Sequence, residues 1–507
     1  MPNVHKNVVF TPLNVHKNVV FASLNVHKNV VFTPLNVHKN VNNLYIWFIF
    51  NNFAYITKQD TKMKRKIYKK LVEWKSNPRH KPLVLLGARQ VGKTYIIKEF
   101  GNNEFDNFVY VNCHNNPFAS SLFTDFNIKR VIYQLEQYNE CSIIPGKTLL
   151  FFDEIQEVKN GIPALKYFCE DLRSLHVVVA GSMLGITLRQ DESYPVGKID
   201  NLKMYPMTFD EFLMANGREL LAESLRNLKW EELSIHHETL IEYLRQYYFA
   251  GGMPEAVATW LESHNAQETR SVQKAILSTY FGDMGKHTKT EVERIRLIWN
   301  SIPSQLAKEN RKFIFGAVKK GARSAEYEKS IQWLVDSGLI YKVCRISKPE
   351  EPLKFYADNS AFKVFMHDVG LLACLCGARS SEMLLGMGAF TEFKGAFTEN
   401  YVMNQIKSLE DSDCIAEEVF YYSKDNSPLE VDFVVQGGKR VIPVEVKAED
   451  NVRSKSLSAF IHNEFAKYSL KALRCSMLPY INQQWMENIP LYAVEAFFSK
   501  EGLGIDG

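Results

Sequence analysis

The chain contains few cysteines, and they do not form a metal-ligand pattern. Only 8 cysteines occur in 507 residues, and most lie singly inside apolar segments. Cys374 and Cys376 make a C-x-C pair, but no second pair at zinc spacing accompanies them. The sequence therefore excludes a disulfide framework and a zinc module, and it indicates buried free thiols in a reducing cytoplasm.

A long apolar run and a strong net charge are also absent. No stretch approaches the ~20 apolar residues that cross a bilayer. The run at 44–50 is too short, and it lacks the charged flank and cleavage site of a signal peptide. The net charge is only +4, so nucleic-acid binding would need a local basic surface. We expect a cytoplasmic protein without a membrane partner.

The first 41 residues form a tandem repeat. The unit at 3–13 recurs at 14–24 and 25–35, and a partial copy follows. Prolines in the unit exclude a continuous helix. The evenly spaced histidines have no neighbouring carboxylate or cysteine to complete a metal site. We expect residues 1–62 to be disordered or foreign to the native protein, with Met63 as the initiator.

A phosphate-binding loop is the most informative motif. Residues 87–94 read G-x-x-x-x-G-K-T and follow the apolar run 82–86, so the loop joins a predicted strand to a predicted helix. Its glycines let backbone N–H groups point at phosphate, and the helix dipole favours the same anion. Lys93 is expected to bridge the β- and γ-phosphates of ATP, and the Thr94 hydroxyl to hold Mg²⁺. The predicted nucleotide contacts are Gly87, Ala88, Arg89, Gln90, Val91, Gly92, Lys93 and Thr94.

Two further strand ends carry polar residues that suit phosphate chemistry. The apolar run 148–152 ends in Asp153 and Glu154. Asp153 is the predicted metal-side carboxylate, and Glu154 is predicted to polarise the attacking water. Ser182 ends the run 176–181, where it would sense the γ-phosphate or serve as a helix N-cap. Both interpretations of Ser182 remain open.

These runs predict an α/β fold with a parallel sheet. A further strand, 108–112, lies between the phosphate loop and the acidic strand. This extra strand and the Asp-Glu pair resemble the AAA-type branch of P-loop ATPases. That resemblance implies a strand order of 5-1-4-3-2.

Several motifs extend the resemblance along the chain. Four further motifs follow the phosphate loop, at residues 153–156, 180–182, 205–212 and 251–255. Thr208 with Glu211 inside the third motif predicts a capping box, and the glycine pair at the start of the fourth predicts a tight turn between helices. In this order the motifs resemble prokaryotic AAA-family ATPases fused to a C-terminal domain of unknown function, over about residues 64–500.

The resemblance leaves an arginine finger unassigned. Arg189 follows the strand that ends at Ser182, whereas many relatives carry Gly-Arg where this chain has Gly197-Lys198. Lysine is a weaker bidentate phosphate clamp than arginine.

Residues 291–345 resemble a winged helix. Two amphipathic helices, a strand at 339–343, a proline-containing loop and a further extended segment at 353–356 follow in order. A winged helix often binds DNA through its second helix. Here that helix carries Glu326, Glu328 and Asp336 against Lys329, so a module that packs on protein is an equal alternative.

A constellation of charged residues lies near the C-terminus. The strands 430–435 and 441–448 are joined by a Gly-Gly hairpin. Glu445 and Lys447 share one face of the second strand, Asp432 lies on the first, and Glu399 comes from an upstream helix. This set resembles the Mg²⁺ cage of PD-(D/E)XK nucleases, in which carboxylates hold the metal and the lysine assists water. A surface hairpin with solvated charges is the alternative, and the fold alone would not imply cleavage.

At 507 residues the chain is too long for one core. We expect an AAA-type ATPase domain at 63–215, a helical lid at 216–290, a winged-helix-like domain at 291–375 and an α/β nuclease-like domain at 376–507. The predicted function is ATP binding and hydrolysis with Mg²⁺, acting on or regulated by nucleic acid such as DNA. The alternative is an ATP-dependent switch that binds a protein partner, with an inactive nuclease-like domain. Oligomerisation stays open.

Overall fold

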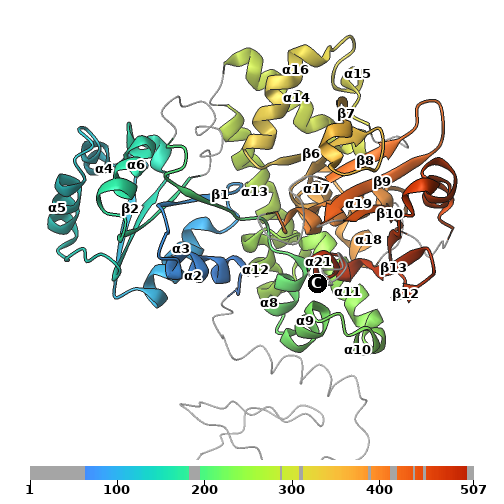
Figure 1. Cartoon of the computed structure of the whole chain (residues 1–507), viewed down its shortest axis with the longest axis horizontal. Coiled ribbons are helices and arrows are strands. Elements are labelled where there is room, and N and C mark those ends of the chain that lie inside the picture. The colour runs from blue at the N-terminus through green and yellow to red at the C-terminus, as the bar shows by residue number, and fades with distance from the viewer. Residues whose placement is uncertain are drawn as a thin grey trace, which may run out of the picture. The chain divides into compact units, whose positions relative to one another are not determined.

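A computed structural model gives the fold of most of the chain (Figure 1). It describes residues 63–181, 195–285, 288–307, 312–385, 390–410, 419–437, 440–448 and 453–499. The tandem repeat, Ser182 and Arg189 lie outside these ranges, so the expectations for them stay predictions.

The N-terminal part of the described chain is built on a five-stranded sheet, in which neighbouring strands pair in parallel. Its strands are β1 (Leu83–Leu86), β2 (Asn107–Asn112), β3 (Thr148–Asp153), β4 (His176–Ala180) and β5 (Asp200–Lys203). They lie in the order β2-β3-β4-β1-β5, which confirms the order that the resemblance implied. The central strands β3 and β4 are buried along their whole length, as expected where helices cover both faces of a parallel sheet.

Successive apolar side chains of the strands point to opposite faces of this sheet, and helices cover both faces (Figure 1). Phe151 packs in one core with α2 (Ile67–Ser76) and α3 (Lys93–Glu104). Phe152 packs in a second core with α5 (Ile128–Asn139) and α6 (Gly161–Asp171). The sheet therefore holds the start of α3 rigidly beside the end of β3, which is where the predicted site lies.

A helical region follows the sheet. Its helices are α8 (Phe209–Ala215), α9 (Glu219–Arg226), α10 (Trp230–Ile235), α11 (His237–Ala250), α12 (Pro254–Ser263) and α13 (Ala266–Met284). Thr208 and Glu211 form the predicted capping box at the start of α8. The glycine pair at 251–252 forms the turn between α11 and α12, where the Gly252 N–H donates to Asp368.

An eight-stranded sheet occupies the C-terminal half. Its strands are β6 (Ile340–Ile346), β7 (Ala357–Met366), β8 (Val419–Ser423), β9 (Glu430–Gly437), β10 (Arg440–Val446), β11 (Ala472–Ser476), β12 (Ile481–Asn482) and β13 (Met486–Pro490). The strand order is β12-β13-β11-β10-β9-β8-β6-β7. The principal flanking helices are α14 (Lys289–Leu306), α16 (Ser324–Asp336), α17 (Val369–Leu375), α19 (Phe390–Lys407), α20 (Lys455–Ala459) and α21 (Val494–Ser499).

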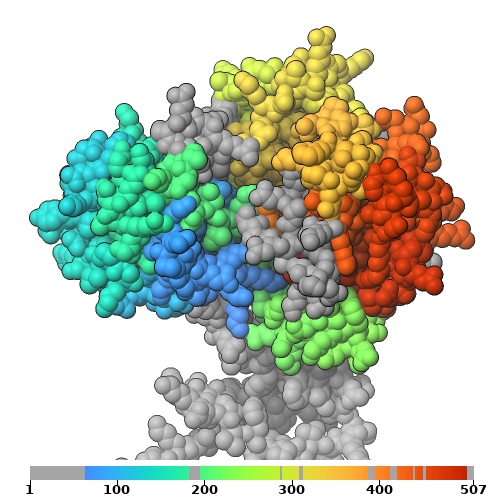
Figure 2. Space-filling model, viewed as in Figure 1, coloured from blue at the N-terminus to red at the C-terminus, as the bar shows by residue number. Residues whose placement is uncertain are grey.

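The region expected to be a winged helix differs from that expectation in two ways. Residues 353–356 form a 3₁₀ turn instead of a strand, and the second strand of the hairpin begins at Ala357. In addition, β6 pairs in parallel with β8, so the hairpin is part of the C-terminal sheet. The expected boundary at residue 375 does not separate two sheets. The helix α14 contacts β7 and the helix α16 contacts β6, and the yellow and orange parts of the chain form one continuous surface in the space-filling view (Figure 2).

Candidate functional site

The phosphate loop runs from the end of β1 to the start of α3, and two of its residues need glycine. Gly87 has φ +146°, and a Cβ there would lie 2.3 Å from the carbonyl oxygen of Met204. Gly92 has φ +101° and directly precedes α3. Gln90 also has a positive φ, +66°. The backbone is thus curled tightly at the N-terminus of a helix, the geometry that presents N–H groups to an anion.

Lys93 lies inside this curl. Its side chain is buried, and its Nζ donates to the carbonyl oxygens of Gly87 at 2.8 Å and Ala88 at 2.9 Å. Burial lowers the pKa of Lys93 to about 8, although the carboxylates of Glu154 and Asp153 act to raise it. Two uncharged carbonyl oxygens therefore hold the ammonium group at the centre of the loop. A bound phosphate would replace them with charged oxygens, which form stronger hydrogen bonds.

Thr94 and Asp153 meet next to the lysine. The Thr94 hydroxyl donates to Asp153 Oδ2 at 2.7 Å, and the Tyr110 hydroxyl donates to the same oxygen at 3.3 Å. Asp153 is buried, and that burial raises its carboxyl pKa. A hydroxyl and a carboxylate in contact suit a hard cation such as Mg²⁺, which takes oxygen ligands and keeps several waters. The donor set fits the predicted metal site.

Glu154 follows directly, in a left-handed conformation with φ +54°. This turn ends β3, and the charge of Glu154 contributes to raising the pKa of Asp153, after the larger effect of burial. Gln156 Nε2 donates to Glu154 Oε2, and the Glu154 carboxylate is near enough to Lys93 to act on its pKa. The structure thus brings Lys93, Thr94, Asp153 and Glu154 to one edge of the sheet, while Ser182 lies beyond the described residues.

Two arginines, Arg65 and Arg89, make contacts around the loop that could not be predicted from the sequence. Arg65 precedes α2 and is buried; its Nη1 donates to the carbonyl of Val91 at 2.9 Å, and its Nη2 donates to the carbonyl of Tyr205 at 2.6 Å. Its Nε also lies 3.2 Å from Glu211 Oε2, the carboxylate of the capping box. Arg65 is one member of an ordinary-looking basic run, so only its tertiary contacts distinguish it.

Arg89 connects the loop to α13. Its Nη1 lies 2.8 Å and 3.0 Å from the two carboxylate oxygens of Asp283. The Tyr280 hydroxyl, one helical turn earlier, lies 3.0 Å from the carbonyl oxygen of Arg89 and 3.2 Å from Nε2 of His367. Nothing in the sequence indicated that Tyr280 and Asp283 lie against the phosphate loop.

The proton on the Tyr280 hydroxyl is shared between two acceptors. His367 Nδ1 lies 3.0 Å from the carbonyl oxygen of Leu339, and a carbonyl can only accept, so Nδ1 carries the ring proton. Burial lowers the pKa of His367 to about 4, so the ring is neutral near pH 7 and Nε2 is an acceptor. A continuous polar path therefore runs from the phosphate loop through Tyr280 to the residues that flank β6 and β7.

The C-terminal constellation is only partly assembled. Glu445 Oε1 lies 2.8 Å from Lys447 Nζ, as their shared strand face predicts. Asp432 Oδ2 accepts the backbone N–H of Val446 at 2.7 Å. The pairing of Phe433 with Val444 on β9 and β10, continued by one residue, puts Asp432 beside Glu445. One oxygen of Glu445, Oε2, is buried without a hydrogen-bond partner.

Glu399 does not join this group. The helix α19 contacts β10, and Val444 and Val446 belong to the core that contains α19, so Glu445 between them points to the opposite face. Glu399 lies instead 4.0 Å from the Nζ of buried Lys363. Within the described ranges, no group of three or more His, Cys, Asp or Glu side chains could hold a metal ion. The expected three-carboxylate cage is therefore not formed.

The comparisons with known proteins agree with the geometry of the first site. Residues 79–213 match the model of an AAA domain, residues 241–382 match a domain of unknown function (DUF8612), and residues 394–493 match another (DUF4143). The chain thus carries an AAA-type P-loop ATPase domain. The functions of the regions that follow are not defined by these matches.

Individual relatives are more distant. Uncharacterized protein MJ1544 of Methanocaldococcus jannaschii is 22% identical over 408 residues, which cover 78% of this chain and 81% of that protein. The structure of Aeropyrum pernix Orc1 in complex with DNA has a TM-score of 0.28 at 12% identity, covering 64% of this chain and 95% of that one. Cdc6p from Pyrobaculum aerophilum has a TM-score of 0.24 at 12% identity, covering 66% and 96%. No helix in the described ranges has the length and apolar character to span a membrane.

Proposed function

We propose that this protein is an ATP-driven switch, in which the phosphate loop binds and hydrolyses Mg²⁺-ATP and passes its nucleotide state to the C-terminal region. One observation carries the proposal. Lys93, buried at the centre of the curled loop, lies next to a Thr94 hydroxyl that is already in contact with Asp153. This is the arrangement that phosphoryl transfer requires of a P-loop site.

Each side chain has a distinct part in this chemistry. Lys93 would exchange the carbonyls of Gly87 and Ala88 for β- and γ-phosphate oxygens. Thr94 and Asp153 would hold Mg²⁺, directly or through a water; when bound, that ion neutralises charge that develops on the phosphate oxygens. Glu154 would orient the attacking water and accept its proton. Tyr110 would keep Asp153 in place through its hydroxyl.

The contacts outside the loop support the switch. Arg89 is bound to Asp283 and Tyr280 of α13, and a Cβ on Gly338, just before β6, would lie 3.4 Å from the Ala88 nitrogen. A loop that rearranges around phosphate would therefore move against α13 and the start of the C-terminal sheet. Interfaces of this kind change between discrete packed states instead of deforming gradually.

We propose further that the C-terminal region binds a partner without cleaving it. Glu399 and Glu445 face opposite sides of the sheet, so the carboxylates do not converge on a metal. The second helix of the winged-helix-like part, α16, carries Glu326 and Glu328 at its exposed start. The partner is either a nucleic acid or a protein, and ATP turnover with and without DNA distinguishes the two.

ATP turnover by the full chain, with and without duplex DNA, tests these proposals. Lys93→Ala should abolish turnover, whereas Lys98→Ala, on the same helix with its Nζ over the Tyr110 ring, should retain most of it. Turnover raised by DNA would identify a nucleic-acid effector. Turnover unaffected by DNA, together with ATP-dependent retention of a protein, would identify a protein partner. Failure to bind ATP at millimolar Mg²⁺ would overturn the switch.

Metal-dependent cleavage tests the C-terminal proposal separately. Incubation of the full chain with DNA and Mg²⁺ should leave the DNA intact. Nicking that is lost in both Asp432→Ala and Glu445→Ala would show that the region cleaves, and would contradict the binding role.

A further inference from the structure

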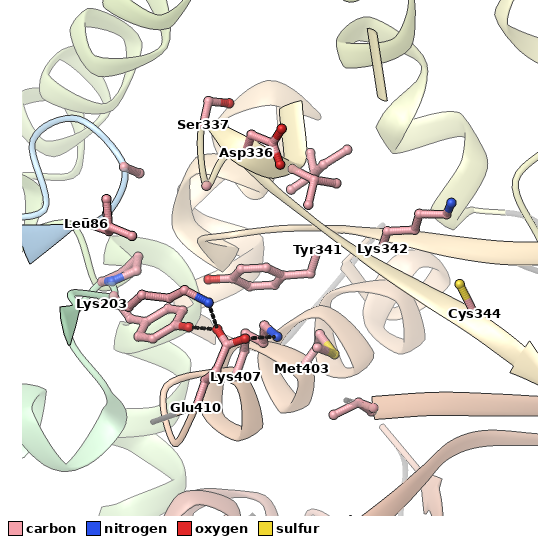
Figure 3. A pocket seen from close by; sticks show the side chains of 18 of the residues that line it. Leu86, Lys203, Asp336, Ser337, Tyr341, Lys342, Cys344, Met403, Lys407 and Glu410 are labelled. Atoms are coloured by element: carbon pink, nitrogen blue, oxygen red, sulfur yellow. Dashed lines mark hydrogen bonds and ion pairs between the residues drawn. The ribbon is translucent and has the colours of Figure 1, made fainter. Parts of the chain in front are cut away.

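A cavity lies behind the phosphate loop, where the ATPase sheet meets the C-terminal sheet (Figure 3). Its volume is about 660 Å³. One side is formed by the chain at the ends of β1 and β5, including Gly87, Ala88 and Lys203. The other side is formed by β6, the start of β8 and the end of α19. Lys93, Thr94 and Asp153 are not among its lining residues, so the cavity adjoins the predicted ATP site through Gly87 and Ala88 without including the residues predicted to carry its chemistry.

The walls of the cavity combine apolar and aromatic surface. Met403 of α19 and Val419 and Phe420 of β8 contribute apolar atoms. The rings of Tyr205 and Tyr341 lie 6.4 Å apart between centroids and are inclined by 57°. Figure 3 shows the Tyr341 ring extending across the cavity toward Lys203. A planar ring in the cavity could stack against these two tyrosine rings.

The charged residues of the cavity are predominantly cationic. Among the described residues, four lysines and two carboxylates line it, which gives these lining residues a formal charge of +2: Lys203, Lys342, Lys354 and Lys407 against Asp336 and Glu410. Lysines arranged around a cavity of this size form a site for an anion, because each contributes a compact point charge. Asp336 is already bound by Gln332, which donates to its Oδ1 at 2.7 Å.

Glu410 organises the positive charge. Lys203 Nζ lies 3.0 Å and Lys407 Nζ 2.9 Å from its carboxylate oxygens, and the Tyr205 hydroxyl donates to it (Figure 3). Burial alone would raise the pKa of Glu410, yet Lys407 and Lys203 together lower it. Two ammonium groups thus meet at one carboxylate, which fixes their positions at this end of the cavity.

We propose that this cavity binds a phosphate-bearing ligand with a planar ring, of about the size of a mononucleotide. Small-molecule sites in proteins are concave and largely apolar, with a few fixed polar groups, and have volumes of roughly 300–1,000 Å³. Here the lysines around Glu410 bind the phosphate by charge-assisted hydrogen bonds. The tyrosine and methionine walls accept the ring. Because Gly87 and Ala88 form one wall, an occupant also contacts the phosphate loop from behind.

Such a ligand could be a free nucleotide or the 5′-phosphorylated end of a nucleic-acid strand, since both present the same chemistry. Calorimetric titration of the full chain distinguishes them, with adenosine 5′-monophosphate as one probe and 5′-phosphorylated thymidine tetranucleotide as the other. Both titrations use a Lys93→Ala background, so that the predicted ATP site does not contribute. Failure of the ATP proposal therefore leaves this test intact.

Lys203→Glu and Lys198→Glu form a matched pair of variants. Each lysine is 41% exposed and forms an ion pair with a glutamate, Lys203 with Glu410 at 3.0 Å and Lys198 with Glu170 at 2.8 Å, and the second pair lies outside the cavity. Lys203→Glu should weaken binding at least about tenfold, because it places a second carboxylate beside Glu410. Lys198→Glu should leave binding unchanged. Thermal melting of both variants checks that they fold.

The outcomes are distinct. Saturable binding of the monophosphate that is weakened only by Lys203→Glu supports a free nucleotide. Binding of the tetranucleotide alone, with the same dependence, supports a strand end. If Lys203→Glu does not fold, Lys407→Gln provides the second test and should weaken binding in the same way. No binding of either probe at millimolar concentration, or binding that neither cavity variant changes, overturns the proposal.

Discussion

The protonation of Lys93 makes ATP binding depend on pH. In the protein without nucleotide, burial lowers the Lys93 pKa to about 8. Bound phosphates would stabilise the ammonium form and raise this pKa, so binding would be coupled to proton uptake. Affinity should therefore be constant below about pH 7 and fall as the pH rises through 8. With a free pKa near 8, the loss relative to pH 7 is about twofold at pH 8 and about tenfold at pH 9, or roughly 1.3 kcal/mol.

Titration calorimetry in buffers with different ionisation enthalpies measures both quantities. At pH 8, binding of Mg²⁺-ATP to the full chain should take up about half a proton, because half of the lysine is neutral. Tyr110 and Cys113, which lie near Asp153, have pKa values raised to about 12 and do not titrate in this range. An affinity that is flat from pH 7 to pH 9, with no proton uptake, would refute the placement of Lys93 at the phosphates.

Three substitutions test how the loop is held. Gly87→Ala would place a methyl group 2.3 Å from the Met204 carbonyl oxygen at φ +146°, and should lower the free energy of unfolding by about 2–4 kcal/mol in chemical denaturation. Asp283→Asn should cost only about 1 kcal/mol, because Arg89 is 42% exposed, and should tighten Mg²⁺-ATP binding a few-fold in a fluorescence titration, since it removes negative charge near the loop. Tyr280→Phe should lower the free energy of unfolding by about 1 kcal/mol, since its hydroxyl bonds the Arg89 carbonyl. Unchanged denaturation midpoints in all three variants would contradict the described packing of the loop.

The site at the phosphate loop could be predicted from sequence because it is local. Gly87 to Thr94 are consecutive, and the acidic end of β3 is recognisable as an apolar run that meets Asp153. The capping box of Thr208 and Glu211 was predictable for the same reason, since three residues define it. The strand order needed more than spacing and came from the family resemblance.

Contacts between distant segments could not be predicted. Arg89 and Asp283 are 194 residues apart, and although Arg89 lies in the recognisable phosphate loop, nothing marks Asp283 as its partner in a chain that is 23% charged. The alternation of β10 correctly put Glu445 and Lys447 on one face, but it could not reveal which face α19 covers. That choice decided whether Glu399 would meet them. The lysines around Glu410 likewise come from β5 and α19, and only the tertiary fold brings them together.

The eight-stranded sheet crosses the border between the two matches of unknown function. Strands β6 and β7 fall within residues 241–382, whereas β8 to β13 fall within residues 394–493. Because β6 and β8 are hydrogen-bonded neighbours, expressing these segments separately would leave each fragment with a newly unpaired strand edge, which promotes aggregation. The two segments that match separate family models therefore contribute to one sheet, and we expect neither to fold without the other.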